Sequence, residues 1–161
     1  MHRGAALSLY DTAVASDWVD YNGHMNDAAY AVVFSHAVDA LMDRIGLDAA
    51  QRKASRRTLY TAQALHRYFA EALAGDALAV SFRLLEHDDK RMRVWLEMFG
   101  RDGVALAVSE QTLLSIDRSG ATPHVADWRA ETRSALDALA RAQRDRAAPT
   151  LAGRGVTMRR D

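Results

Sequence analysis

Four side chains suited to acyl chemistry stand at every second position of one short segment: Asp20, Asn22, His24 and Asn26. A helix is predicted to start directly after them, and the first backbone N–H groups of a helix have no partner within it. Such amides, near Gly23 and His24, can hold the negative oxygen that develops when an acyl carbonyl is attacked. The Asp20 carboxylate can attack the carbonyl or take a proton from water, and Gly23 lets the backbone approach a substrate closely. The segment therefore favours an acyl-transfer site with an oxyanion hole.

Other interpretations of this segment have to be compared with that one. Asp, Asn and Gly are also common in loops that only cap a helix, so a purely structural role stays open. The alternating oxygens resemble the start of a calcium loop, but the required glycine and closing glutamate are missing. Asp20 and His24 have no further ligand at a helical spacing, and no Gly-x-Ser-x-Gly segment is present. We therefore expect no metal, no cofactor and no serine nucleophile.

The overall composition narrows the class of protein. A chain of 161 residues with 49% hydrophobic residues suits one globular domain, which we place at residues 1–147. The 21 Lys and Arg balance the 21 Asp and Glu, so no nucleic-acid partner is expected. The sequence contains no cysteine, which excludes disulfides and thiolate chemistry. Without a long apolar run, neither membrane contact nor secretion is expected, and a cytoplasmic location is predicted.

A stripe of apolar residues predicts one long helix after the loop. From Tyr30 to Ile45 the apolar residues follow the i, i+3, i+4, i+7 spacing of a helix with one buried face. Asn26 is a suitable cap, Asp27 suits the positive end of the helix dipole, and Gly46 suits the other end. The predicted helix therefore presents its amino end to the loop.

Alternating patterns predict an antiparallel sheet around this helix. The expected strands, joined by short polar turns, cover residues 7–17, 58–69, 77–85, 91–98 and 104–116. Residues 51–57 are predicted to be a polar linker, 127–147 an amphipathic helix capped by Asp127, and 148–161 a disordered basic tail. This order is typical of an α+β fold with an antiparallel sheet of about five strands on one long central helix. The open sheet edges favour a homodimer or a dimer of dimers.

The loop, Trp-Val-Asp-Tyr-Asn-Gly-His-Met-Asn at residues 18–26, resembles the signature of the 4-hydroxybenzoyl-CoA thioesterase-like family of hot-dog proteins. It is still more similar to the thioesterases of carnitine breakdown, including the domain fused to some L-carnitine dehydrogenases. The similarity continues through residues 60–61, 65–66, 74–76 and 109–117, and so covers about residues 7–125. It implies a hot-dog fold, in which the sheet wraps around the long helix, and hydrolysis of a short acyl-CoA thioester, with betainyl-CoA as the implied substrate.

The resemblance also implies roles for single residues. In that family the acid three residues before the loop glycine is the base or nucleophile, and this position is Asp20 here. Plant acyl-ACP thioesterases carry a similar Asp-x-Asn-x-His pattern, which implies that Asn22 and His24 position the thioester or water. Gln63 stands in a strand where an acid is expected. Two other functions remain open for the fold: an acyl-CoA hydratase or dehydratase, and a non-catalytic acyl-CoA-binding protein.

Further candidate residues surround the loop. Glu110 shares its parity with the apolar residues of its strand, so regular alternation would bury it as a second acid, whereas a bulge would turn it outward. A betainyl group carries a permanent cation, which aromatic faces can bind. His66 and Tyr68 lie on one predicted strand face and are either pocket or core residues. The candidate substrate-binding residues are Tyr21, Gly23, Met25, Asn26, Tyr30, His66 and Tyr68.

Overall fold

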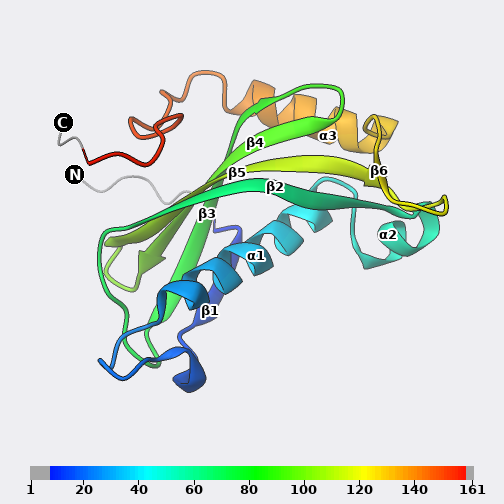
Figure 1. Cartoon of the computed structure of the whole chain (residues 1–161). Helices are drawn as coiled ribbons and strands as arrows, with labels where there is room; N and C mark the ends of the chain where they lie inside the picture. Colours follow the sequence, from blue (N-terminus) through cyan, green and yellow to red (C-terminus); the bar gives the residue numbers. More distant parts are fainter. Residues whose placement is uncertain (1–7, 159–161) are drawn as a thin grey trace.

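A six-stranded antiparallel sheet curls around helix α1 in the computed structural model, which describes residues 8–158 (Figure 1). Its strands are β1 (Tyr10–Ala13), β2 (Arg57–Tyr68), β3 (Ala77–His87), β4 (Arg91–Gly100), β5 (Ala105–Asp117) and β6 (His124–Val125). They follow the order β1-β3-β4-β5-β2, and β6 pairs with the end of β5. Helix α3 (Ala130–Ala142) lies on the opposite side of the sheet from α1 (Asp27–Arg44). The predicted α+β arrangement of one sheet around one long helix, with a further helix near the carboxyl end, is confirmed.

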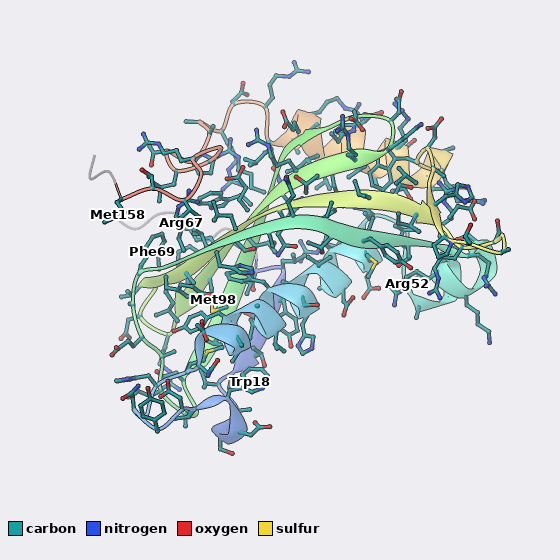
Figure 2. All side chains as sticks on the ribbon, in the orientation of Figure 1. Trp18, Arg52, Arg67, Phe69, Met98 and Met158 are labelled. Carbon is teal, nitrogen blue, oxygen red and sulfur yellow. The ribbon has the colours of Figure 1, made fainter. Side chains whose placement is uncertain are left out.

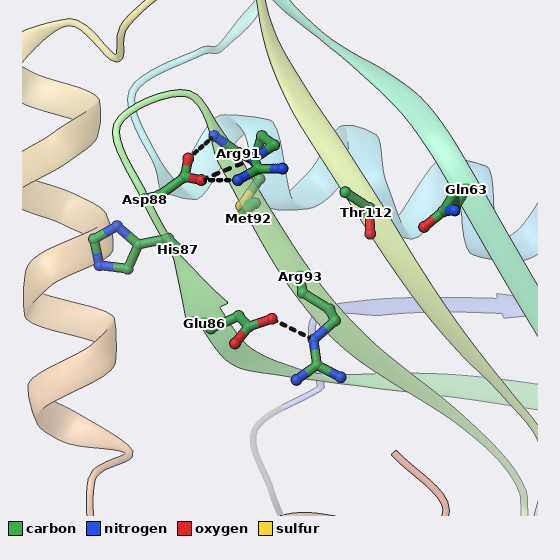
Figure 3. Close-up of a pocket in the computed structure, with 8 residues that line it drawn as sticks. All are labelled: Gln63, Glu86, His87, Asp88, Arg91, Met92, Arg93 and Thr112. Carbon is green, nitrogen blue, oxygen red and sulfur yellow. Dashed lines mark hydrogen bonds and ion pairs between the residues drawn. The ribbon is translucent and has the colours of Figure 1, made fainter. Parts of the chain in front are cut away.

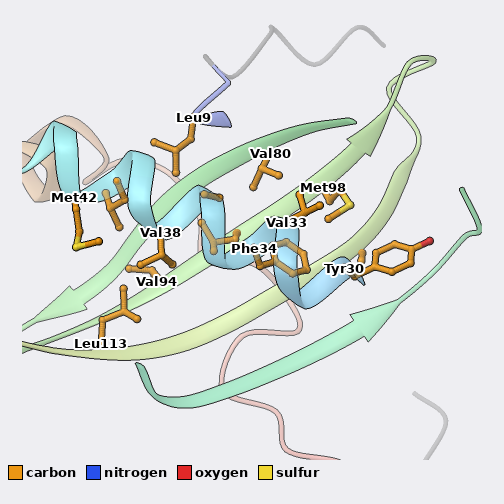
Figure 4. Close-up of a cluster of buried hydrophobic side chains, with 14 of the residues drawn as sticks. Leu9, Tyr30, Val33, Phe34, Val38, Met42, Val80, Val94, Met98 and Leu113 are labelled. Atoms are coloured by element: carbon orange, nitrogen blue, oxygen red, sulfur yellow. The ribbon is translucent and has the colours of Figure 1, made fainter. Parts of the chain in front are cut away.

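Helix α1 begins and ends where the sequence predicts. The Asn26 Oδ1 accepts a hydrogen bond from the Ala28 N–H at 2.8 Å, and Gly46, with φ of +78°, follows the last turn. Figure 4 shows side chains of α1 and of strands β3 to β5 meeting in one core. All the predicted apolar positions of the helix are buried there: Tyr30, Val33, Phe34, Ala37, Val38, Leu41, Met42 and Ile45.

The first strand and the linker differ from prediction. Strand β1 ends at Ala13 because residues 16–18 form a short 3-10 helix, and Leu7 lies outside the described residues. The predicted linker contains helix α2 (Ala49–Ser55), which Asp48 caps by accepting from the Gln51 N–H at 2.8 Å. None of the α2 residues is buried, so no apolar stripe marks this helix in the sequence.

Helix α3 starts after the predicted cap, Asp127. Trp128 turns inward instead, where it is buried and its Nε1–H donates to the Asp88 carbonyl at 2.8 Å. The helix then begins at Ala130 without a side-chain cap. No helix in residues 8–158 is long and apolar enough to cross a membrane.

The residues of strand β5 that face α1 are not the ones that regular alternation predicts. Met98 pairs with Ala107 but Phe99 pairs with Ala105, so β5 carries one extra residue at Leu106. After this bulge the odd-numbered residues face α1 and the even-numbered ones face outward. Of the two alternatives left open for Glu110, the structure therefore has the bulge that turns it outward, and regular alternation does not bury it on the apolar face.

Residues 146–154, which we name the C-terminal strap, run along the side of the sheet opposite α1 (Figure 1). The Arg83 guanidinium in β3 donates to two strap carbonyls. The guanidinium of Arg67 in β2, which is labelled in Figure 2, donates to a third. The Gly153 N–H donates to both carboxylate oxygens of Glu110, at 3.1 and 2.9 Å. These contacts are not typical of the disordered tail predicted for 148–161, whose last residues, 159–161, lie outside the described ones.

Candidate active site

The loop before α1 fixes the Asp20 carboxylate through its own backbone. The Asp20 N–H donates to the His24 carbonyl at 3.0 Å, and the Gly23 N–H donates back to the Asp20 carbonyl at 3.0 Å. The Asn22 N–H donates to Asp20 Oδ1 at 2.8 Å, which is the hydrogen bond of an Asx turn. Gly23 has φ of +81°, a left-handed conformation that glycine adopts without strain. The loop thus holds the half-buried Asp20 side chain in one orientation.

Two groups of this loop remain available for chemistry. Within residues 8–158, Asp20 Oδ2 accepts no hydrogen bond, so one oxygen of the carboxylate is held and the other is open. The His24 N–H also has no acceptor in the described part of the chain. The Gly23 N–H closes the turn instead, so of the two amides expected near the oxyanion only that of His24 is open.

The His24 side chain lies beside an acid that sequence analysis did not single out. His24 Nε2 is 3.0 Å from Glu71 Oε2. The Met25 N–H donates to the Ala72 carbonyl at 2.7 Å and so draws the segment after β2 against the loop. Because Glu71 reaches the site only through this long-range contact, no local spacing in the sequence indicates it. Its carboxylate can orient the imidazole of His24.

Two tyrosines pack edge to face at the amino end of α1. The ring centroids of Tyr30 and Tyr68 are 5.3 Å apart, with an angle of 83° between the rings. The Tyr30 hydroxyl donates to the Ala70 carbonyl at 3.2 Å, and that of Tyr68 to the Asp27 carbonyl at 3.4 Å. Burial raises the pKa of both phenols, so both remain protonated near neutral pH. Tyr30 is buried, whereas Tyr68 is 48% exposed and offers surface to a ligand.

The remaining loop candidates have different environments. Tyr21 is almost fully exposed, and the Asn22 side chain is exposed as well. Met25 is buried in the core, and Asn26 caps α1, so both have a structural task in this fold. In residues 8–158 no three His, Asp or Glu side chains come together in a way that could hold a metal ion.

His66 stacks on Phe34 in the groove between β2 and α1. The two rings are nearly parallel, with centroids 5.5 Å apart. The groove, with a volume of about 230 Å³, is also lined by Ser35, Asp39 and Gln111. The His66 Nδ1 is buried and has no hydrogen-bond partner in the described structure. Burial lowers the pKa of His66 below 6.5 and favours the neutral imidazole.

This shift in pKa predicts a pH dependence of stability. The fold favours neutral His66, so its contribution is complete above about pH 6.5, the pKa of an unfolded histidine, and is lost as pH falls below it. His66→Phe keeps the ring stack but cannot take up a proton. Urea unfolding at about pH 7.5 and about pH 5.5 should therefore show a smaller loss on acidification for His66→Phe than for wild type. An equal loss in both proteins would contradict the assignment, and exposed His124→Phe is the control.

Glu110 lies apart from the loop, on the outer face of the sheet. Arg93 Nη1 donates to Glu110 Oε1 at 2.7 Å, and Arg93 Nε donates to Glu86 Oε1 at 2.8 Å. Figure 3 shows the Arg93–Glu86 pair in an open cavity of about 400 Å³ that Asp88 also lines. The structure therefore brings Asp20, Asn22 and His24 together in one loop and does not bring Glu110 to them.

The geometry predicts that loss of Glu110 acts on stability. Its side chain is 11% exposed and binds both Arg93 and the strap amide of Gly153. Glu110→Ala should lower the free energy of unfolding in urea by about 1–3 kcal/mol, because both donors lose their acceptor. Glu86→Ala is a matched control, since Glu86 pairs with the same arginine but is 66% exposed, and should cost at most about 1 kcal/mol. A fall in kcat of the folded Glu110→Ala enzyme would instead support the catalytic role considered from sequence.

The chain is similar to proteins of one family over most of its length. The family model of the Thioesterase-like superfamily matches residues 14–141. A betainyl-CoA thioesterase of Pseudomonas aeruginosa is 41% identical over 93% of this chain and 94% of its own length. An L-carnitine dehydrogenase/betainyl-CoA thioesterase of Agrobacterium fabrum is 42% identical over 93% of this chain, which spans 30% of that longer protein.

Solved structures agree with this relationship. A putative thioesterase of Pseudomonas putida has a TM-score of 0.81 and 37% identity, with 97% of this chain and 99% of that chain covered. A Staphylococcus aureus protein solved in complex with CoA has a TM-score of 0.85 over 93% of this chain and 94% of that one, and at 23% identity it supports the fold. The chain with the Asp20 loop therefore belongs to the thioesterase-like superfamily, the relationship that its loop signature predicts.

Proposed function

We propose that the protein is a thioester hydrolase that cleaves betainyl-CoA to the free acid and CoA. The observation that carries this proposal is the Asp20 carboxylate, with one oxygen held by the Asn22 amide and the other open, next to the open His24 amide. The names of the relatives that match nearly the whole chain support the choice of acyl group.

The proposed chemistry needs only groups of this chain. Asp20 Oδ2 takes a proton from water or attacks the carbonyl itself, and in either case a C–O bond forms and the C–S bond breaks. The His24 N–H and the positive end of α1 stabilise the negative oxygen of the intermediate. The thiolate of CoA leaves and takes up a proton. Asn22 fixes Asp20 through its backbone, and Glu71 orients the His24 ring.

We further propose that the protein forms a homodimer, or a dimer of dimers, through β2. This strand of 12 residues is at the edge of the sheet, and the side opposite β5 has no strand partner in the described chain. Its residues 60–64 are exposed, and an unpaired edge of this length is a template for pairing with a second copy. Sedimentation equilibrium measures this directly, and a monomer at micromolar concentration would contradict the proposal.

A thiol-release assay over a panel of CoA thioesters tests the function. We expect betainyl-CoA to have the highest kcat/KM, with one equivalent of CoA released for each acid formed. Addition of water to an enoyl-CoA without release of thiol would identify a hydratase. Saturable binding of acyl-CoA without turnover would identify a non-catalytic binding protein. Higher kcat/KM for neutral short chains would overturn the betainyl assignment but keep the hydrolase.

An isotope experiment tests whether Asp20 attacks the carbonyl directly or activates a water molecule. In a single turnover in water labelled with ¹⁸O, attack by the carboxylate forms a mixed anhydride, and water that cleaves it at the Asp20 carbonyl leaves the label in the Asp20 side chain. Label in Asp20 therefore identifies covalent attack, whereas activation of water by Asp20 places the label in the released acid and leaves the side chain unlabelled. Mass spectrometry of the loop peptide and of the product reads out both outcomes.

A further inference from the structure

The proposed substrate sets an electrostatic problem at the amino end of α1. In a betainyl thioester a single methylene separates the trimethylammonium group from the reacting carbonyl. The helix dipole and amides that stabilise the negative oxygen repel this cation. A site that prefers such a substrate therefore needs compensating negative charge and aromatic surface beside the first turn of α1.

We infer that the exposed face of Tyr68, flanked by the carboxylates of Asp27 and Glu71, binds the trimethylammonium group and selects cationic acyl chains. We name these three residues the ammonium subsite. The inference rests on the proposed function and adds the residues that determine its specificity. Glu71 also contacts His24, so the subsite is tested by a ratio of two substrates in which any loss of catalysis common to both cancels.

The aromatic part of the subsite is rigid and accessible. The Tyr68 ring is held by T-shaped packing against the buried ring of Tyr30 and, at its hydroxyl, by the Asp27 carbonyl, 3.4 Å away. It is nevertheless 48% exposed. The negative face of an aromatic ring attracts a quaternary ammonium, and a ring that is already ordered loses little entropy when it binds one.

Each carboxylate lies close enough to one tyrosine of the pair to act on it electrostatically, Glu71 on Tyr30 and Asp27 on Tyr68. Asp27 is the first residue of α1, and its Oδ1 accepts from the Ala28 N–H at 2.9 Å. Glu71 follows Ala70, to which the Tyr30 hydroxyl donates, and its carboxylate contacts His24. Repulsion from Glu71 and from Asp27 adds to burial in raising the pKa of Tyr30 and of Tyr68, respectively, so both carboxylates act on the rings.

In the part of the chain that the structure describes, these two carboxylates have no Lys or Arg partner. Within residues 8–158, neither Asp27 nor Glu71 forms an ion pair with a Lys or Arg side chain. Among the described residues, the ion-pair partner of Glu71 is His24. The negative charge is therefore available to a bound ammonium group.

A matched pair of substrates tests the subsite. Betainyl-CoA and 3,3-dimethylbutanoyl-CoA have nearly the same shape and differ in a positive nitrogen against a neutral carbon. The ratio of their kcat/KM values isolates the charge, because any loss common to both substrates cancels. We expect wild type to prefer betainyl-CoA. Tyr68→Leu, Asp27→Asn and Glu71→Gln should each lower this ratio by about 2- to 30-fold.

Two further variants serve as controls. Tyr68→Phe retains the aromatic face and should retain the ratio. Asp43→Asn removes a carboxylate from the far end of α1 and should leave the ratio unchanged. If Tyr68→Leu does not fold, Glu71→Gln still decides the question, since Glu71 is 72% exposed.

The possible results separate this inference from the proposed function. Equal kcat/KM of wild type for the two thioesters, or a ratio unaffected in all three subsite variants, would overturn the ammonium subsite and leave a thioester hydrolase. Absence of thiol release from any CoA thioester would overturn the proposed function itself. A lower ratio in the subsite variants, with Tyr68→Phe and Asp43→Asn unchanged, supports the subsite.

Discussion

Asp20→Asn should reduce kcat/KM for the best CoA thioester by at least about 10²-fold and leave the fold intact. The Asn amide can neither take a proton from water nor attack the carbonyl. Its Oδ1 can still accept the hydrogen bond that Asn22 donates to Asp20, so the Asx turn is kept. Thiol release under single-turnover and steady-state conditions gives the loss, and circular dichroism verifies the fold.

Two companion variants make this result specific. Asp20→Ala removes the carboxylate and the acceptor of the turn, so it should lose at least as much activity and also loosen the loop. Asp17→Asn removes an exposed acid from the preceding 3-10 helix and should retain activity. Wild-type rates in a folded Asp20→Asn enzyme would show that another group performs the hydrolysis.

The largest loss of stability is expected for Phe34→Ala. Phe34 is completely buried in α1, where its ring lies parallel to that of His66 in β2. Removing the ring leaves a cavity that the curled sheet cannot fill, at a cost of about 3–5 kcal/mol. Urea unfolding followed by far-UV circular dichroism measures the change. The control is Val32→Ala on the exposed face of the same helix, which should change stability by about 0.5 kcal/mol or less.

A loss below about 1 kcal/mol for Phe34→Ala would mean that the core between α1 and the sheet relaxes around the missing ring. Phe34→Ala should also affect activity toward the substrate, because the Phe34 ring stacks on His66, which lines the groove between α1 and β2. Activity should therefore be measured well below the melting temperature of the variant, so that unfolding does not contribute.

The parts of this structure that could be predicted from sequence are those with local causes. Helix α1 is predicted from the spacing of its apolar residues and from its caps, Asn26 and Gly46, and these signals involve neighbours within a few residues. Both ends of the helix lie where these signals place them. The Asp20 loop is local in the same sense, since its Asx turn joins residues only two apart. The strands also alternate locally, which is why most of their bounds agree with prediction to within one or two residues.

The parts that could not be predicted depend on contacts between distant segments. One extra residue at Leu106 reverses the faces of the rest of β5, and no glycine or proline stands within two residues of it to mark the bulge. Glu71 reaches His24 only because the segment after β2 packs against the loop. The strap, which consists mostly of small residues with an arginine at each end, resembles a solvated tail in composition. Its partners on distant strands give it an ordered path.

The C-terminal strap has a consequence for the rates of folding and unfolding. Its anchors join segments far apart in sequence, such as Gly153 to Glu110 and Arg154 to Arg67, and contacts that close such long loops form late in folding. Contacts absent from the folding transition state slow unfolding without speeding folding. The stability lost in Glu110→Ala should therefore be found almost entirely in a faster unfolding rate constant. The strap thus sets how long a folded molecule persists, and not how quickly it forms.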